Sequence, residues 1–177
     1  MLPHNPNTDT QFDEASLRTI CLAGGCFWGT EAYMARIPGV ARTSCGYANG
    51  QTVNPTYKEV CTGETGHAEA IMLHYDPGKI ALDRLLTAFF ETIDPTTLNR
   101  QGPDVGTQYR TGIYCTETQD TAAVASFVEE RQAGYDEPIV TEVLPLESFY
   151  PAEEYHQRYL EKNPGGYCHV DLGKLSN

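Results

Sequence analysis

The sequence has little positive charge, no long apolar run and only one tryptophan. Twelve Lys and Arg residues stand against 24 Asp and Glu residues among 177, a formal net charge of −12 with histidine neutral. This balance argues against a nucleic-acid backbone or an anionic membrane surface as a partner. No apolar stretch approaches the roughly 20 residues of a membrane span, and residues 1–11 lack the basic-then-apolar pattern of a signal peptide. We therefore expect a cytoplasmic protein that binds neither nucleic acid nor membrane. We also expect it to be a monomer.

The sequence also lacks a metal-binding arrangement of its six cysteines. No Cys-x-x-Cys pair occurs, and the only histidine near a cysteine is His169, so a zinc site is disfavoured. A chain of this length can bury its own core without disulfides, so free thiols in a reducing compartment are favoured over three structural disulfides. Four of the cysteines are most simply small buried hydrophobes, namely Cys21, Cys45, Cys61 and Cys115.

The pattern of apolar residues predicts an α+β protein with one folded domain over residues 16–177, preceded by a flexible polar leader at 1–15. Strands are expected at 17–23, 40–47, 67–75, 110–116 and 139–145, and helices at 27–37, 80–93, 118–134 and 152–163. Two long irregular segments, 51–66 and 94–109, are of the length that often carries function. The order β-α-β-β-α-β indicates a two-layer sandwich around a ferredoxin-like split βαβ core, with extra helices and long active-site loops.

Cys26 is the candidate nucleophile. It lies in Gly24-Gly25-Cys26-Phe27-Trp28-Gly29, between a predicted strand and a predicted helix. Free backbone N–H groups and the positive end of the helix dipole at such a turn are expected to favour the reactive thiolate. Phe27 and Trp28 could form an apolar wall beside the sulfur, and we expect the flanking glycines to leave room for a substrate.

Acid–base chemistry could come from Gly66-His67-Ala68-Glu69-Ala70. Glu69 interrupts an apolar strand, so its carboxyl is either solvated on an open face or enclosed, and the pattern leaves both alternatives open. If it is enclosed, its pKa rises and it becomes a proton donor near neutrality. His67 could transfer a proton or contact substrate, although a hydrogen-bonded structural histidine is favoured.

Three further candidates lie in the loops and one in the tail. Tyr57 and Tyr109 could hydrogen-bond a polar substrate atom while their rings enclose an apolar one, or they could be packing residues. Asp104 could position a loop or bind substrate. Cys168, in a glycine-rich tail, could attack an oxidised Cys26 and close a disulfide, or it could be a bystander.

Six segments together resemble the peptide methionine sulfoxide reductases of the A type, which act on the S epimer. They run in the family's order and span about residues 20–168, nearly the whole chain. The segments are Gly25-Cys26-Phe27-Trp28-Gly29, Gly46-Tyr47-Ala48-Asn49-Gly50, Gly66-His67-Ala68-Glu69, Gly106-Thr107-Gln108-Tyr109-Arg110, Glu153-Glu154-Tyr155-His156-Gln157 and Asn163-Pro164-Gly165-Gly166-Tyr167-Cys168.

The resemblance implies a reaction: reduction of methionine-S-sulfoxide, free or in proteins, as repair of oxidative damage. Cys26 matches the nucleophile that attacks the sulfoxide sulfur and becomes a sulfenic acid. Phe27 and Trp28 match the residues that hold the S-methyl group. Glu69 matches the acid that protonates the sulfoxide oxygen.

The resemblance also implies the remaining substrate contacts and the recycling step. Tyr57 and Tyr109 match phenols that bond the sulfoxide oxygen, Asp104 matches a substrate-binding residue, and His67 is a further candidate contact. Cys168 matches the recycling cysteine, and residues 171–177 contain no other, which implies a two-cysteine cycle. The family needs no metal or organic cofactor and takes electrons from thioredoxin, or from dithiothreitol in vitro.

Some alternatives stay open from the residues alone. Cys26 paired with His67 or His156 would suit a cysteine hydrolase or acyltransferase, although that class does not explain a tail cysteine. An aromatic pocket without catalysis would suit a binding module. Cys21 and Cys45 stand where aliphatic residues are expected, and either could form an off-pathway disulfide.

Overall fold

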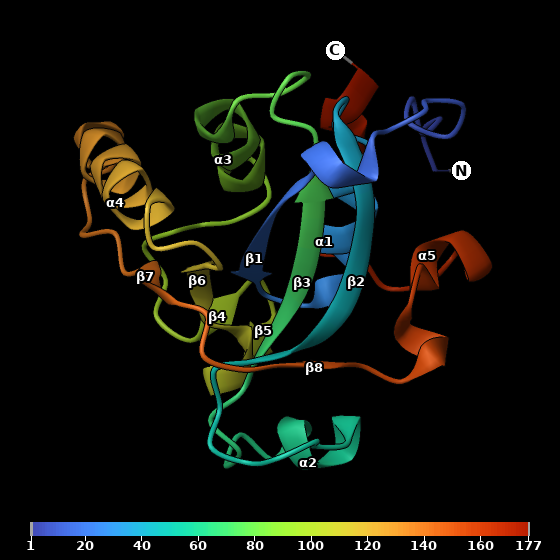
Figure 1. Cartoon of the computed structure of the whole chain (residues 1–177). Helices are drawn as coiled ribbons and strands as arrows, with labels where there is room; N and C mark the ends of the chain where they lie inside the picture. Colours follow the sequence, from blue (N-terminus) through green and yellow to red (C-terminus); the bar gives the residue numbers. More distant parts are fainter. Residues whose placement is uncertain (1, 177) are drawn as a thin grey trace.

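The computed structural model describes residues 2–176, so Met1 and Asn177, which our leader and domain boundaries include, lie outside the described residues. Six strands form one mixed sheet in the order β7-β6-β1-β3-β2-β8 (Figure 1). Their bounds are β1 Arg18–Gly24, β2 Val40–Ala48, β3 Ala68–Tyr75, β6 Thr111–Cys115, β7 Glu142–Pro145 and β8 Phe149–Pro151. A separate two-stranded sheet pairs β4 Arg100–Gln101 with β5 Asp104–Val105.

The α-helices are short and connect these strands. Their bounds are α1 Phe27–Met34, α2 Tyr57–Cys61, α3 Leu82–Phe90, α4 Asp120–Arg131 and α5 Tyr159–Lys162. Turns of 3₁₀ helix occur at Glu14–Ser16, Thr107–Tyr109, Gln132–Gly134, Glu154–His156 and Leu172–Ser176. Among the described residues, no helix combines the length and the apolar character needed to cross a membrane.

The mixed α+β class predicted from the sequence is confirmed. Strand β3 lies between β1 and β2 and is antiparallel to both, and α1 makes the connection from β1 to β2. Strand β6 pairs antiparallel with β1, so the four inner strands have the order expected of a split βαβ unit. Two outer strands extend them: β7 runs parallel to β6, and β8, which the sequence did not predict, pairs with β2.

Strand β1 is buried on both faces, as its apolar run predicts. Ile20 and Leu22 join the main core with residues of α1, α3 and α4, and α1 lies behind the strands in Figure 1. Cys21 and Ala23 alternate with them and join a smaller cluster on the opposite face. The turn that carries Cys26 therefore directly follows a strand that is buried on both faces.

The continuous helix predicted over 152–163 is wrong. The chain forms β8, a 3₁₀ turn and only then α5, with Arg158 in the left-handed region at φ 49°. The cause is Gln157, whose amide accepts from the backbone N–H of Cys45 at 2.8 Å and donates to its carbonyl at 2.9 Å. This side chain continues the pairing along the edge of β2 beyond β8, and the helix is interrupted there.

The two segments predicted to be irregular also contain regular structure. Helix α2 lies within 51–66 and begins with a reciprocal capping box between Thr56 and Glu59. The β4–β5 pair and the 3₁₀ turn at Thr107–Tyr109 lie within 94–109. A single turn of helix and a two-residue strand are too short to leave a periodic signal in the sequence.

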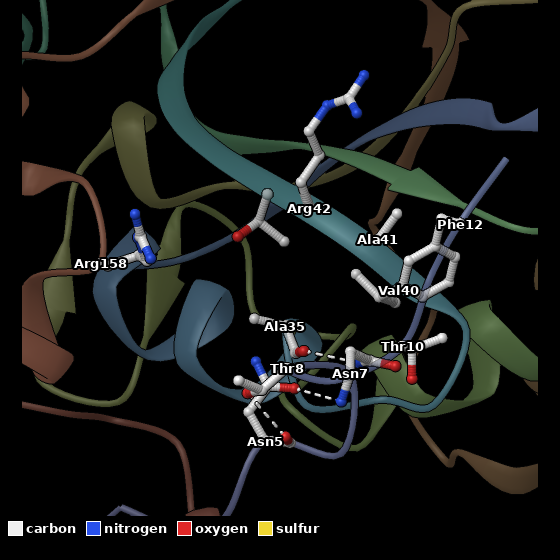
Figure 2. A pocket seen from close by; sticks show the side chains of 11 residues that line it. Asn5, Asn7, Thr8, Thr10, Phe12, Ala35, Val40, Ala41, Arg42 and Arg158 are labelled. Carbon is white, nitrogen blue, oxygen red and sulfur yellow. Dashed lines mark hydrogen bonds between the residues drawn. The ribbon is translucent and has the colours of Figure 1, made fainter. Parts of the chain in front are cut away.

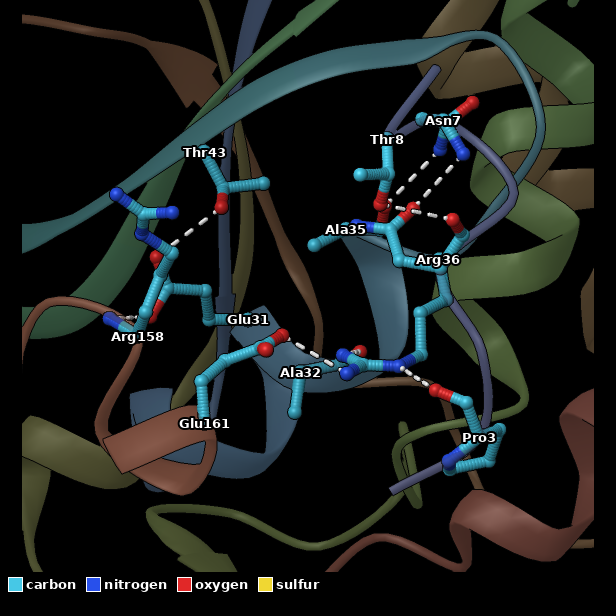
Figure 3. Close-up of polar contacts among 11 residues, drawn as sticks. Pro3, Asn7, Thr8, Glu31, Ala32, Ala35, Arg36, Thr43, Arg158 and Glu161 are labelled. Atoms are coloured by element: carbon cyan, nitrogen blue, oxygen red, sulfur yellow. Dashed lines mark hydrogen bonds and ion pairs between the residues drawn. The ribbon is translucent and has the colours of Figure 1, made fainter. Parts of the chain in front are cut away.

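The polar segment before residue 16, expected to be a flexible leader, lies against the end of α1 (Figures 2 and 3). The Asn7 amide donates to the carbonyls of Ala35 and Ile37 at 3.0 and 2.9 Å. The Arg36 guanidinium donates to the carbonyl of Pro3 at 2.7 Å. These hydrogen bonds hold the leader against the end of α1.

Candidate active site

Cys26 is the N-cap of α1, directly after the turn that ends β1. Gly25 has φ +81°, a conformation that L side chains rarely adopt, and this lets the chain turn sharply into the helix. The thiol is only 7% exposed. Its position at the junction of strand and helix is as the sequence predicts.

The expected preference for the thiolate is wrong for the resting protein. Burial raises the pKa of the Cys26 thiol well above its ordinary value, and the nearby charge of Glu69 raises it further. A hydrogen bond from the backbone N–H of Trp28 acts in the opposite direction but does not outweigh them. The resting nucleophile is therefore a protonated thiol.

The glycines around Cys26 make room for other parts of the chain, and not for a substrate as expected. A Cβ on Gly25 would lie 2.7 Å from the Cβ of Gln101 and 3.1 Å from Nε2 of His169. A Cβ on Gly29 would lie 3.0 Å from Sγ of Cys168 and 3.2 Å from Nδ1 of His169. These two glycines form a cradle for the C-terminal tail.

The Glu69 carboxyl is enclosed, which resolves the alternative left open by the sequence. It is 1% exposed, and it shares with Ile71, two residues further along β3, the sheet face that α1 covers. Burial raises its pKa to about 8, although the Phe27 backbone N–H, which donates to Oε1 at 3.2 Å, opposes the shift. Oε2 is buried and has no hydrogen-bond partner among the residues that the structure describes. At neutral pH this carboxyl is protonated and can donate.

His156 lies at the centre of an aromatic cluster beside Cys26. Its Nδ1 accepts from the indole N–H of Trp28 at 3.0 Å, and its ring centroid is 5.1 Å from that of Phe27 and 4.4 Å from that of Tyr57. The Trp28 ring also stacks on that of Tyr159, with 3.7 Å between the ring centroids. The structure thus gathers three residues that the sequence predicted for the pocket, Phe27, Trp28 and Tyr57. It adds two that sequence reasoning did not place there, His156 and Tyr159. The available signals were the family resemblance of the segment Glu153 to Gln157 and the possible pairing of His156 with Cys26.

The two phenols lie at the ends of short elements, Tyr57 opening α2 and Tyr109 ending a 3₁₀ turn. Glu153 was missed from the sequence and anchors the first: it accepts from the Tyr57 backbone N–H at 3.0 Å and from the Tyr47 hydroxyl at 2.8 Å. Burial, followed by the charge of Glu69, raises the pKa of both Tyr57 and Tyr109. Both phenols therefore stay protonated and can donate.

His67 has no ring nitrogen free for a substrate. Its Nδ1 accepts from the backbone N–H of Gly50 at 3.0 Å, and its Nε2 donates to the carbonyl of Thr52 at 2.7 Å. The ring meets Tyr150 edge-on. These two hydrogen bonds hold the loop after β2, which favours the structural role over the substrate contact that the sequence also offered.

Asp104 and Cys168 reach the site from the tail side of α1. Asp104 accepts a hydrogen bond from the Tyr167 hydroxyl at 2.8 Å, and its charge raises the pKa of Glu69 and of Cys26. Cys168 is half-buried, and its thiol donates to the Val170 carbonyl at 3.2 Å. Since its sulfur packs on Gly29, the structure brings the second thiol to the turn of α1 that begins at Cys26.

The other cysteines divide into two groups. Cys21, Cys45 and Cys115 are buried, as predicted, whereas Cys61 is exposed at the end of α2. The Cys45 thiol donates to the carboxyl of Glu31 at 3.1 Å. Glu31 is itself 2% exposed and was not singled out from the sequence.

A buried thiol beside a protonated carboxyl, with phenols on one side and a second thiol on the other, is the site of a thiol-dependent oxidoreductase on an α+β fold. The comparisons with known proteins give the family. Residues 18–177 match the family model described as peptide methionine sulfoxide reductase, and the chain belongs to that family.

Relatives and solved structures agree with this assignment. The chain is 57% identical to the peptide methionine sulfoxide reductase MsrA of Alkaliphilus metalliredigens over 156 residues, 88% of this chain and 99% of the relative. It is similar to Mxr1 from Saccharomyces cerevisiae in reduced form, with 41% identity and a TM-score of 0.84 over 91% and 93% of the two chains. Mxr1 in complex with Trx2 is also similar, with 28% identity and a TM-score of 0.60 over 86% and 91%.

Proposed function

We propose that this chain reduces the S epimer of methionine sulfoxide, free or in proteins, with Cys26 as nucleophile and Glu69 as acid. Membership of the peptide methionine sulfoxide reductase family gives the reaction. The observation that carries the residue assignment is the enclosed Glu69, with a pKa of about 8 and one carboxyl oxygen without a partner. A sulfoxide sulfur becomes a good electrophile only when its oxygen is protonated or strongly hydrogen-bonded.

The first step transfers oxygen to Cys26. Its sulfur attacks the sulfoxide sulfur while Glu69 protonates the oxygen. The S–S bond so formed and the substrate S–O bond then break as the hydroxyl passes to the Cys26 sulfur, and methionine leaves. The thiol proton of Cys26 returns to Glu69, so the products are the thioether and a sulfenic acid, and no external acid is consumed. This route suits a nucleophile that rests as a thiol, because Glu69 can exchange one proton with it.

The aromatic cluster provides selectivity. Phe27 and Trp28 form an apolar wall suited to the S-methyl group, and the phenols of Tyr57 and Tyr109 are donors suited to the sulfoxide oxygen. A thioether lacks that oxygen and would leave buried donors unpaired, so product is released more readily than substrate.

The second step recycles the nucleophile. The Cys168 thiol attacks the Cys26 sulfenic acid, an S–S bond forms as the S–O bond breaks, and water leaves with the thiol proton. Thioredoxin then reduces the disulfide by thiol–disulfide exchange, and the complex of the relative Mxr1 with Trx2 supports a partner of this kind. The cycle requires no metal or organic cofactor.

The proposed reaction is tested with the two epimers of a methionine-sulfoxide peptide and dithiothreitol. We expect methionine from the S epimer only, and none from either epimer with Cys26→Ser. The matched control is Cys61→Ser, the same substitution at the exposed thiol, which should retain methionine formation. If the wild-type protein forms no methionine from the S epimer, the proposal is wrong.

The recycling step is tested with Cys168→Ser. Without reductant, this variant should form about one methionine per protein and leave a sulfenic acid on Cys26 that a nucleophilic trap captures. Thioredoxin-driven turnover should be lost. Undiminished turnover would show that another thiol recycles Cys26 or that thioredoxin acts on the sulfenic acid directly.

A further inference from the structure

His169 is a partly buried histidine that the proposed reaction does not yet use. Its Nε2 lies 2.9 Å from the carbonyl of Gly24, the last residue of β1. A carbonyl only accepts, so Nε2 carries the proton and Nδ1 is left with a free lone pair. Within residues 2–176 that Nδ1 is buried and has no hydrogen-bond partner. Burying a nitrogen without a hydrogen-bond partner costs free energy, so an unpartnered one calls for a functional explanation or a transient partner.

The Nδ1 nitrogen and the recycling thiol both pack against Gly29 of α1. Nδ1 of His169 and Sγ of Cys168 are 3.2 and 3.0 Å from one point, the Cβ position that Gly29 lacks. The opposite edge of the ring, at Nε2, is 3.1 Å from the Cβ position that Gly25 lacks. The imidazole therefore lies along the first turn of α1, with Cys26 between the two glycines that admit it.

We propose that His169 takes the proton of Cys168 when that thiol attacks oxidised Cys26, while its Nε2 holds the tail against Gly24. This inference rests on the proposed two-cysteine cycle. The thiol proton moves to Nδ1, the S–S bond forms as the S–O bond of the sulfenic acid breaks, and the proton then joins the departing hydroxide as water. The step is balanced without any other oxidant or reductant.

The surroundings explain why such a base is needed. Burial raises the pKa of Cys168, so this thiol is protonated at neutral pH, and its partner, the Val170 carbonyl, cannot remove the proton. Burial lowers the pKa of His169, although the Gly24 carbonyl and the charge of Asp104 raise it, so the lone pair on Nδ1 is available. The ionisable groups near the ring in the described residues include Asp104 of β5 and Cys168.

The test separates docking from proton transfer with His169→Gln. The glutamine amide N–H can reach the Gly24 carbonyl in place of Nε2, but it offers no base. Wild type and variant are mixed with excess methionine-S-sulfoxide peptide without reductant, quenched with an alkylating agent, and analysed for methionine and for free thiols on Cys26 and Cys168. We expect methionine at the wild-type rate, and disulfide formation slower by about 10²-fold.

The pH dependence supplies a readout that a structural role would not change. In His169→Gln the disulfide rate should rise about tenfold per pH unit with the thiolate fraction of Cys168. In the wild type it should level off once His169 is neutral. The control is Asp171→Asn in the same tail, whose exposed side chain caps only the Gly173 N–H and should leave both steps unchanged.

Each other outcome decides against one of the two proposals. An undiminished disulfide rate in His169→Gln, or a slower rate with the wild-type pH profile, would overturn the role of His169 as a base. Loss of methionine formation in the variant alone would also overturn it, because the histidine would then serve the whole site. If the wild-type protein itself forms no methionine, the proposed function fails instead.

Discussion

The two sides of Cys26 are built differently. The substrate side consists of side chains from regular elements and a 3₁₀ turn that meet in a hydrogen-bonded aromatic cluster: Phe27, Trp28, Tyr57, Glu69 and His156. The tail side consists of side chains from short strands and an irregular segment that pack on glycine backbone: Gln101, Cys168 and His169 against Gly25 and Gly29.

The difference concerns proton transfer. The substrate side holds a carboxyl whose burial keeps it protonated, and the tail side holds an imidazole whose burial keeps it neutral. Environments that push two groups toward opposite protonation states mark an acid and a base. The Cys26 sulfur can thus take oxygen from the substrate beside a proton donor, Glu69. It can then lose that oxygen beside a proton acceptor, His169.

The largest expected effect is on stability, and it comes from Glu69 on the substrate side. Glu69 titrates near 4.5 when exposed and at about 8 in the folded protein, so the unfolded chain loses its proton first. Between these pH values the unfolded state binds fewer protons, and the free energy of unfolding falls as pH rises, by on the order of 5 kcal/mol from this residue.

Glu69→Gln should remove that part of the pH dependence. Denaturant unfolding of both proteins from pH 4 to pH 9 measures it: the stability of the variant relative to wild type should increase over this range. Parallel curves for the two proteins would mean that Glu69 is not held protonated by the fold.

The next largest effect is on the rate of methionine formation in the same variant. Glutamine keeps the shape of Glu69 but cannot protonate the sulfoxide oxygen, so the single-turnover rate should fall by about 10³-fold. Disulfide formation, started from Cys26 oxidised separately with hydrogen peroxide, should keep its wild-type rate. An equal loss in both steps would show that the two sides do not act separately.

A smaller effect is expected at the centre of the aromatic cluster. His156→Leu removes the acceptor for the Trp28 indole N–H, and we expect the KM for the sulfoxide peptide to rise about tenfold, consistent with the loss of one buried hydrogen bond. His156→Asn, which keeps an oxygen near the position of Nδ1, should recover part of it.

Trp28 is the only tryptophan, so its fluorescence reports directly on this change. The emission of His156→Leu should shift to the red as the indole gains contact with water. An unchanged spectrum together with an unchanged KM would remove His156 from any role in positioning the apolar wall.

The smallest effect is expected from Gly29→Ala on the tail side. Alanine favours a helix over glycine by about 1 kcal/mol, but its Cβ would press on Cys168, His169 and Val170 at 3.0 to 3.2 Å. We expect disulfide formation to slow several-fold while methionine formation is retained. A loss confined to methionine formation would show that Gly29 serves the substrate side.

The sequence allowed much of this arrangement to be predicted, and the misses have local causes. The apolar run of β1 followed by a glycine turn located Cys26, and the order of strands and helices predicted the α+β class. Whether Glu69 is enclosed depends on α1 lying over β3, which the pattern of one strand cannot show. The break at Arg158 depends on Gln157 pairing with a strand more than 100 residues away.

His67 and His169 show that position in the sequence does not determine whether a histidine is free to react. His67 stands in a segment that resembles the family's active site, yet its nitrogens bind a loop. His169 drew attention only as the histidine nearest a cysteine, yet its free nitrogen lies with Cys168 on Gly29. Sequence position indicates which residue types are available, whereas hydrogen-bond partners determine which of them remain free to react.

The central claim is that oxidation passes from Cys26 on the substrate side to Cys168 on the tail side. It is tested most directly by the disulfide map of the wild-type protein after one turnover with excess methionine-S-sulfoxide peptide and no reductant. The account predicts one methionine per protein, a Cys26–Cys168 disulfide and four free thiols. A disulfide joining Cys26 to Cys45 or Cys61, or a Cys168 that stays free, would contradict it.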